Sequence, residues 1–392
     1  MQNKFSSLFS PYMLTRDIAL RNRIVMAPMT TWSANPDGTI SDQELAFYQR
    51  RARDVGLVIT GCTFVTPEGI GFTDEFAAYD DRFINSLEKL ASAAKSGGAT
   101  AILQIFHAGN KALPELIPNG DVVSASMSYA KAGDINSEAI QSRAMTESEI
   151  QTTIRAFGAV TRRAIKAGFD GVELHGAHGF LLQNFFSPLF NKRVDRWGGD
   201  LENRMRFPLA VLQEVKNAVY ECATKPFVIG YRISPEESAE GGLRIEDTYK
   251  LLDRLISSGI SYIHTSLVSV NNSYPVESPN GPETIDLILN HIAERIPVIA
   301  AGKLRTPEQA QEALSRGLPL VAIGKGLVIN PEWVALVKAG RINEIQTSLN
   351  PRAVKELTIP DKLWNVILAS KGTHTSEPRS KAALWPTSTA RW

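Results

Sequence analysis

The sequence contains little cysteine, no excess of charge of either sign and no long hydrophobic run. Cys62 and Cys222 are its two cysteines in 392 residues, and their separation matches no metal-ligand spacing, which argues against a disulfide framework, a zinc site or an iron–sulfur cluster. The 42 basic and 41 acidic residues leave a net charge of +1, which argues against binding to nucleic acid or to a membrane surface. No segment reaches transmembrane length, and the N-terminus lacks a signal-peptide pattern. These absences favour a soluble, cytoplasmic globular protein.

Eight short apolar runs, rich in β-branched residues, recur along the chain. They are continuous rather than alternating, as expected for parallel strands that are covered by helices on one face and by packed side chains on the other. The runs span residues 24–29, 56–61, 100–106, 170–175, 227–233, 262–266, 297–302 and 319–324.

Amphipathic stretches typical of helices lie between these runs. Two of them begin with capping-box pairs, Ser41 with Glu44 and Thr146 with Glu149. The others cover residues 83–98, 207–221, 245–259, 282–295 and 307–317. Strict alternation of strands and helices predicts an α/β fold of the (β/α)₈ TIM-barrel type. An open, doubly wound sheet is the alternative, and the lack of a G-x-G-x-x-G motif after the first strand disfavours it.

The expected organisation is a single TIM-barrel domain over residues 1–392. The barrel itself should occupy about 22–340, with an N-terminal cap before it and a C-terminal extension over 341–392. Two connections exceed the usual loop length: 107–145 after the third strand and 176–200 after the fourth. Long loops in compact domains are usually functional, and catalytic loops of barrels follow the C-terminal ends of strands. The polar tail at 371–392 is expected to form a surface arm.

Two histidines follow the fourth strand, in the segment "VELHGAHGFLLQNFFSP" at 172–188. A buried strand has no structural need for both His175 and His178. A metal is one explanation, but H-x-x-H requires a third ligand and no nearby carboxylate motif supplies one. Two imidazole N–H groups that bind a carbonyl or phenolate oxygen explain the pair more simply.

Other strand ends carry residues suited to a phosphorylated, flat cofactor. "AAGK" (300–303) and "AIGKG" (322–326) close the last two strands, where barrels commonly bind phosphate. Arg232 ends the fifth strand, where a charge is costly unless it is paired; it either forms a salt bridge with Glu173 or Glu236, or faces a developing anion. Gln104, in the third strand, can both donate to and accept from a pyrimidine edge. Together these residues indicate flavin mononucleotide.

The chain resembles the Old Yellow Enzyme family of FMN-dependent oxidoreductases. The resemblance rests on "NRIVMAPMT" (22–30), "LQIFHAGNK" (103–111), "GVELHGAHGFLLQNFFSPLFNKRVDRWGGDLENRMRF" (171–207) and the pair "IAAGK" and "AIGKG". It covers about residues 5–340 in the family's order, and 171–207 is its most specific part. The resemblance implies a (β/α)₈ barrel with non-covalent FMN, reduced by NADH or NADPH and reoxidised by a small-molecule electron acceptor such as an activated alkene.

The family's site residues carry over position by position. His175 and His178 match the catalytic pair that binds the acceptor's carbonyl oxygen, and Trp32 and Phe180 fall at substrate-contacting positions. Thr30 matches a residue that bonds near flavin O4 and N5, and Gln104 and Arg232 match flavin-ring contacts. The cofactor-binding set implied by the resemblance is Pro28, Met29, Thr30, Cys62, Gln104, Arg232, Gly302, Lys303, Gly324 and Lys325, and no metal is implied.

The sequence also departs from the family. Many members have a proton-donating tyrosine where this chain has Phe180, which puts ordinary ene-reduction in doubt. Trp32 stands where one branch has a substrate-stacking tyrosine. The cluster-binding cysteines and extra nucleotide-binding domains of another branch are absent, so the chain resembles the short, single-domain form. C-terminal arginines reach a neighbouring subunit in one branch, so Arg391 and Trp392 raise the option of a homo-oligomer.

Several functions stay open at this point. The leading one is an NAD(P)H-dependent FMN oxidoreductase that reduces alkenes. A second keeps the flavin but reduces quinones, nitro compounds or free flavin, none of which needs protonation at carbon. A third is a metal-dependent barrel hydrolase that uses His175 and His178, and a fourth is a flavin- or phosphate-binding protein without turnover.

Overall fold

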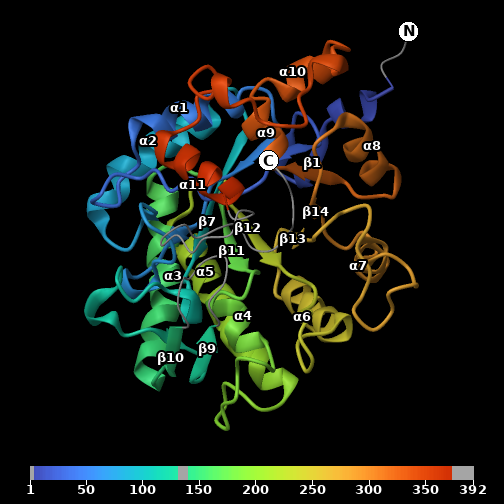
Figure 1. The fold of residues 1–392 in the computed structure, drawn as a ribbon. Helices are drawn as coiled ribbons and strands as arrows, with labels where there is room; N and C mark the ends of the chain where they lie inside the picture. The colour runs from blue at the N-terminus through green and yellow to red at the C-terminus, as the bar shows by residue number, and fades with distance from the viewer. Residues whose placement is uncertain (1–3, 131–139, 373–392) are drawn as a thin grey trace.

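The fold is a closed barrel of parallel strands surrounded by helices (Figure 1). It is seen in a computed structural model, which describes residues 4–130 and 140–372. Within those residues the barrel consists of β3 (Ile24–Met26), β4 (Leu57–Ile59), β7 (Thr100–Phe106), β11 (Gly171–Gly176), β12 (Val228–Ile233), β13 (Tyr262–Ser266), β14 (Val298–Ala301) and β15 (Leu320–Ile323). Each strand pairs in parallel with the next, and β15 pairs with β3 to close the ring. The predicted (β/α)₈ barrel is confirmed, with all eight strands at the predicted places.

Helices follow the barrel strands and cover their outer faces (Figure 1). They are α1 (Asp42–Arg51), α2 (Ile84–Lys95), α3 (Glu147–Lys166), α5 (Leu201–Cys222), α6 (Ile245–Ser257), α7 (Thr284–Ile292) and α8 (Pro307–Ser315), with α9 (Lys325–Ile329), α10 (Trp333–Lys338) and α11 (Asp361–Gly372) after the last strand. Both predicted capping boxes are present, at Ser41 and at Thr146. Helix α5 begins six residues before the predicted start, because the Asp200 side chain accepts from the Asn203 backbone N–H and caps it there.

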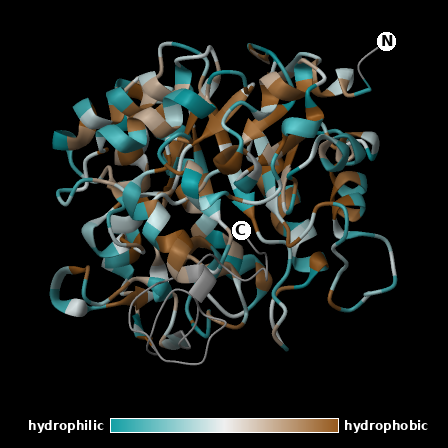
Figure 2. Ribbon diagram, turned by 45° about the horizontal axis from the view of Figure 1, so that its top comes forward, coloured by the Kyte–Doolittle hydropathy of each residue, from teal (hydrophilic) through white to brown (hydrophobic). Residues whose placement is uncertain are grey.

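The apolar side chains form two cores. One fills the space between the strands and the outer helices. The other fills the barrel interior, with Val25, Leu57, Ile102, Val228, Ile299 and Leu320 among its members. A hairpin of β1 (Tyr12–Thr15) and β2 (Ile18–Leu20) adds Leu14 and Leu20 to this interior core. The hairpin is the predicted N-terminal cap. Figure 2 shows the brown, apolar strands at the centre and teal, polar helix surfaces outside.

The two long connections build additional structure on the barrel. Residues 107–145 contain β8 (Val123–Ser124), β9 (Ser128–Ala130) and β10 (Ile140–Ala144), which pair into a small sheet. Residues 176–200 contain α4 (Leu181–Phe186), and β5 (Thr63–Phe64) and β6 (Phe76–Ala77) extend the sheet beyond β7. Short 3₁₀ turns are η1 (Ser6–Phe9), η2 (Pro67–Gly69), η3 (Asp81–Phe83), η4 (Gly109–Lys111), η5 (Pro118–Gly120), η6 (Ile342–Glu344) and η7 (Pro351–Ala353).

Most of the tail for which a surface arm is predicted lies outside the described residues, as do Arg391 and Trp392. Across the part of the chain that the structure describes, no helix has the length and apolar character needed to cross a membrane.

Candidate functional site

A cavity of about 800 Å³ opens at the C-terminal ends of the barrel strands. Residues from the ends of β12, β13, β14 and β15, and from the loops after β3 and β11, line its wall. Eight of the predicted site residues belong to this lining: Pro28, Met29, His178, Arg232, Gly302, Lys303, Gly324 and Lys325. The barrel therefore brings together, at one mouth, residues that lie up to 297 positions apart in the sequence.

The other predicted residues lie beside the cavity rather than in its lining. They are Thr30, Trp32, Cys62, Gln104, His175 and Phe180, of which all except Thr30 are buried. Thr30 and Cys62 are in contact, with Oγ1 and Sγ 3.4 Å apart. The Cys62 thiol in turn donates to the Glu75 carboxyl at 3.1 Å. Burial raises the pKa of Glu75 to about 8, so a neutral carboxylic acid lies behind the Thr30–Cys62 contact.

The two histidines form an edge-to-face pair with their ring centroids 5.0 Å apart. His178 has a positive φ of 59°, and its backbone N–H donates to Ser234 Oγ at 3.0 Å. Its Nε2 lies 2.8 Å from Ser266 Oγ. Burial lowers the pKa of both imidazoles well below the usual value, and the positive charges of Arg232 and Lys111 add to the effect. Both rings are therefore neutral at physiological pH and can each donate one N–H.

Phe180 and Trp32 belong to an aromatic cluster behind the histidines. The Phe180 ring packs edge-on against His175, at 4.9 Å, and against Phe106, at 5.0 Å. Trp32 packs edge-on against Phe72, at 5.6 Å. Phe72 also contacts Phe180, at 6.1 Å. The position that carries tyrosine in many family members is therefore apolar and surrounded by rings.

Arg232 is buried in the cavity wall and forms no ion pair with any described residue. Its Nη2 donates to Ser266 Oγ at 3.1 Å, while its Nε has no hydrogen-bond partner within the described part of the chain. Neither Glu173 nor Glu236 lies within 4.0 Å of the guanidinium among the described residues, so the predicted alternative of a structural salt bridge is not realised. Burial lowers the pKa of Arg232, and the charge of Glu173 opposes that change.

A buried polar cluster beneath the cavity was not predicted. The Glu173 carboxylate accepts from Gln104 Nε2 at 2.6 Å, from the Tyr262 hydroxyl at 2.9 Å and from His264 Nδ1 at 2.9 Å. Gly230 makes room for this cluster, because a Cβ there would lie 2.1 Å from the Tyr262 ring. The sequence does carry a signal, since an acid within the apolar strand 171–176 is unusual.

The two Gly-Lys pairs face the same cavity from β14 and β15. A side chain at Gly302 would bring a Cβ within 2.5 Å of the Leu267 carbonyl oxygen, so this position accepts only glycine. Gly324 immediately precedes α9, where the first backbone N–H groups have no partner within the helix. Burial, together with the nearby charge of Arg305, lowers the pKa of Lys325 to about 8.

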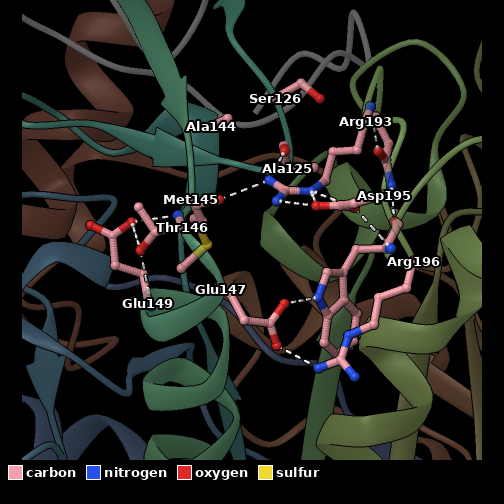
Figure 3. Close-up of polar contacts among 12 residues, drawn as sticks. Ala125, Ser126, Ala144, Met145, Thr146, Glu147, Glu149, Arg193, Asp195 and Arg196 are labelled. Atoms are coloured by element: carbon pink, nitrogen blue, oxygen red, sulfur yellow. Dashed lines mark hydrogen bonds and ion pairs between the residues drawn. The ribbon is translucent and has the colours of Figure 1, made fainter.

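The loop after β11 is fastened to its neighbours by a polar network (Figure 3). Arg193 donates to the carbonyls of Ala125, at 2.9 Å, and Met145, at 2.8 Å, and pairs with Asp195. Trp197 Nε1 donates to Glu147 at 2.6 Å. The same loop contributes Leu189 and Phe190 to the cavity wall. The segment 171–207, the most specific part of the family resemblance, therefore both lines the cavity, through His178 and Phe190, and supports its wall, through Arg193 and Trp197.

Among the described residues, no group of three or more His, Cys, Asp and Glu side chains is arranged to hold a metal ion. The site is instead a barrel mouth lined by cations and by the neutral imidazole of His178, which is typical of a barrel enzyme that binds an anionic cofactor.

Residues 7–344 match the NADH:flavin oxidoreductase / NADH oxidase family, and the chain belongs to this family. A probable NADH-dependent flavin oxidoreductase, YqiG of Bacillus subtilis, is 40% identical over 95% of this chain and 98% of its own length. An NADPH dehydrogenase of Geobacillus thermodenitrificans is 36% identical over 83% of this chain and 92% of its own. NADH:fumarate oxidoreductase of Klebsiella pneumoniae is 35% identical over 92% of this chain, which spans 39% of that protein.

Solved structures agree with the fold. Morphinone reductase superimposes with a TM-score of 0.70 at 25% identity, over 86% of this chain and 91% of its own. The predicted Old Yellow Enzyme resemblance is confirmed, and so is the prediction of an enzyme that holds FMN non-covalently and takes electrons from NADH or NADPH. These matches leave no support for the metal-dependent hydrolase.

Proposed function

We propose that the cavity at the barrel mouth binds FMN and then a small electron acceptor in turn. When bound, FMN accepts a hydride from NAD(P)H and passes it on to an electron-poor acceptor. The donor set at the mouth suits this cofactor, because cations and free N–H groups gather where an anion and an electron-rich ring edge would lie.

The phosphate end belongs to the loops after β14 and β15. Gly302 and Gly324 bring backbone to the cavity wall without a side chain, and Lys303 and Lys325 supply positive charge. With a pKa of about 8, Lys325 is still mainly protonated at neutral pH, and a bound phosphate would favour its charged form.

The ring end belongs to the strands on the other side of the mouth. The Arg232 guanidinium, which belongs to the cavity lining, donates to the electron-rich edge of the ring. Gln104 retains an N–H and its carbonyl oxygen, since one N–H is used by Glu173. Pro28, Met29, Thr30 and Cys62 complete this side. The Cys62 thiol donates to Glu75, so the Thr30 hydroxyl donates to Cys62 Sγ and keeps its oxygen as an acceptor.

The acceptor binds through its oxygen to His175 and His178, both neutral N–H donors. Phe180 and Trp32 support this part of the site as apolar rings. Phe180 cannot donate a proton, which favours quinones, nitro compounds and other acceptors that need no proton on carbon over simple enones.

One observation carries the proposal: a buried guanidinium lies in the cavity with its Nε unpartnered. A buried charge with an unused donor is costly unless a ligand pairs with it. Arg232→Ala should therefore weaken FMN binding at least about tenfold and lower the flavin's reduction potential. Arg16→Ala, at a side chain that is 92% exposed, is the matched control. Unchanged affinity and potential in Arg232→Ala would show that Arg232 is structural.

The same proposal covers the organisation of the chain. We propose that residues 22–340 form the FMN-binding barrel, that 341–392 form its extension, and that the two act as one domain. We also propose that the protein binds no nucleic acid. The buried Cys62 and exposed Cys222 are both free thiols, which suits the reducing cytoplasm.

Light scattering of the full chain tests whether the protein forms a homo-oligomer. A yellow preparation that NADH bleaches distinguishes the oxidoreductase from an idle flavin-binding protein.

A further inference from the structure

Lys111 is a cation in the cavity wall with no part in the proposed flavin site. It ends η4, which follows directly after β7. Its Nζ donates to the backbone carbonyl of His178 and lies 5.7 Å from the centroid of the Phe180 ring. A molecule bound at the histidine pair therefore lies near the positive charge of Lys111, which is hydrogen-bonded to the 178–180 turn.

The cavity as a whole carries more positive than negative charge. Its lining among the described residues includes five cationic side chains and two carboxyl groups: Lys111, Arg232, Lys303, Arg305 and Lys325, against Glu236 and Glu237. The proposed FMN contacts use Arg232, Lys303 and Lys325, and Arg305 lies near Lys325. Lys111 is the cation that remains on the acceptor side.

Neither carboxyl group forms an ion pair with Lys111, although the charge of Glu237 acts on Lys111 and opposes the lowering of its pKa. Glu237 accepts from Gln183 Nε2 at 2.8 Å, and through its other oxygen from Ser187 Oγ at 2.6 Å and the Leu243 backbone N–H at 3.1 Å. Glu236 is likewise occupied, because its two oxygens accept backbone N–H groups at 3.2 and 3.0 Å. Among the described residues, no carboxylate oxygen lies within 4.0 Å of Lys111 Nζ.

An unpaired, partly buried ammonium group is unfavourable, and burial lowers the pKa of Lys111 accordingly. One of its three N–H groups is used by the His178 carbonyl, which leaves two donors. The neutral imidazoles of His175 and His178 offer neutral N–H groups, so they suit a carbonyl or phenolic oxygen. Lys111 suits a full negative charge.

We propose that the electron acceptor of this enzyme carries an anionic group, a carboxylate, and that Lys111 binds it beside the oxygen held by the histidine pair. This rests on the proposed acceptor site at His175 and His178. The structural alternative is that Lys111 only fixes the 178–180 turn through the His178 carbonyl. The two roles differ in one respect, because a structural lysine supports charged and neutral ligands equally.

Matched phenols separate the two roles without turnover. The dissociation constants of 3- and 4-hydroxybenzoate and of the corresponding hydroxybenzamides are measured on oxidised, FMN-loaded enzyme, by calorimetry and by the change in flavin absorbance. The carboxamides keep the phenol and the shape but lack the charge. We expect wild type to bind at least one carboxylate about tenfold more tightly than its carboxamide. Lys111→Gln should lose this ratio and Lys111→Arg should keep most of it.

Two results would overturn the proposal. The first is a wild-type enzyme with equal dissociation constants for the carboxylates and the carboxamides. This result can be obtained without any variant. The second is a Lys111→Gln enzyme that weakens both ligand classes by the same factor, as a structural lysine would. The ratio should also fall as the pH rises through the lowered pKa of Lys111. FMN content and bleaching by NADH are measured on the same samples, so failure of the flavin site is seen separately.

Discussion

The hydroxyl of Ser266 lies 2.8 Å from His178 Nε2 and also accepts from Arg232 Nη2 at 3.1 Å. An arginine N–H can only donate, so Arg232 uses a lone pair of Ser266 Oγ and leaves the Ser266 proton free. Donation of that proton to Nε2 leaves the His178 proton on Nδ1. Ser266 therefore links the residue that faces the flavin to the residue that binds the acceptor.

Removal of this hydroxyl should weaken the acceptor site. We expect Ser266→Ala to bind phenols about two- to tenfold more weakly, since a neutral hydrogen bond contributes about 0.5–1.5 kcal/mol. The charge-transfer band between a phenolate and oxidised flavin gives the affinity. Ser266→Thr keeps the hydroxyl and should retain wild-type binding; an equal loss in both variants would point to packing instead.

The histidine pair gives phenol binding a defined pH dependence. Burial holds the pKa of both imidazoles well below 6.5, so neither gains a proton between pH 6 and 8. We expect phenolate to be the bound form, so affinity should rise with pH toward the pKa of the phenol. His175→Ala and His178→Ala should each weaken binding. Stoichiometric zinc that these variants lose would instead restore the metal interpretation.

Glu75 should make the folded state less stable as the pH rises. Its pKa is about 8 in the folded protein and about 4.3 in an unfolded chain. The unfolded state therefore releases this proton first, and the contribution of Glu75 to stability is lost between about pH 4.5 and 8. Glu75→Gln keeps an oxygen for the Gly71 backbone N–H, which donates to Glu75 at 3.0 Å.

Denaturant unfolding across that range tests the effect. Wild type should lose more free energy of unfolding between pH 5 and 8 than Glu75→Gln does. Glu308→Gln, at an exposed side chain paired with Lys4, serves as the control. Parallel pH curves for wild type and Glu75→Gln would show that Glu75 is ionised in the folded state.

The sequence was sufficient to predict the barrel fold, because each barrel strand is buried on both faces and therefore appears as one continuous apolar run. The strand at 171–176 is an example, with all six residues buried. The mouth residues were predictable for the same reason, since the C-terminal ends of all barrel strands share one edge.

The polar cluster around Glu173 needed the closed barrel. Glu173 stands opposite Gln104 on one neighbouring strand and Gly230 on the other, and Gly230 stands opposite Tyr262. That these four positions form one layer can be recognised only when the register of the four strands is known. The Glu75–Cys62 contact depends in a similar way on the path of the connection between β4 and α2, which no periodicity in the sequence describes.

Phe180 sets the last prediction, because saturation of an enone requires a proton on the α-carbon as well as a hydride. A positioned general acid contributes about 10²- to 10⁴-fold to such a transfer, and the Phe180 ring has no proton to give. We expect normal bleaching by NAD(P)H, slow reoxidation by cyclohexenone and fast reoxidation by quinones, measured by anaerobic stopped flow.

Phe180→Tyr should speed the enone reaction at least about tenfold and leave reduction by NAD(P)H nearly unchanged. Tyr274 is a second candidate for the proton donor, because it lines the cavity and is 42% exposed. If wild type already reduces enones rapidly and Tyr274→Phe slows it, the proton comes from Tyr274. The apolar residue at 180 would then leave alkene reduction unaffected, because the proton donor has moved from the loop after β11 to the loop after β13.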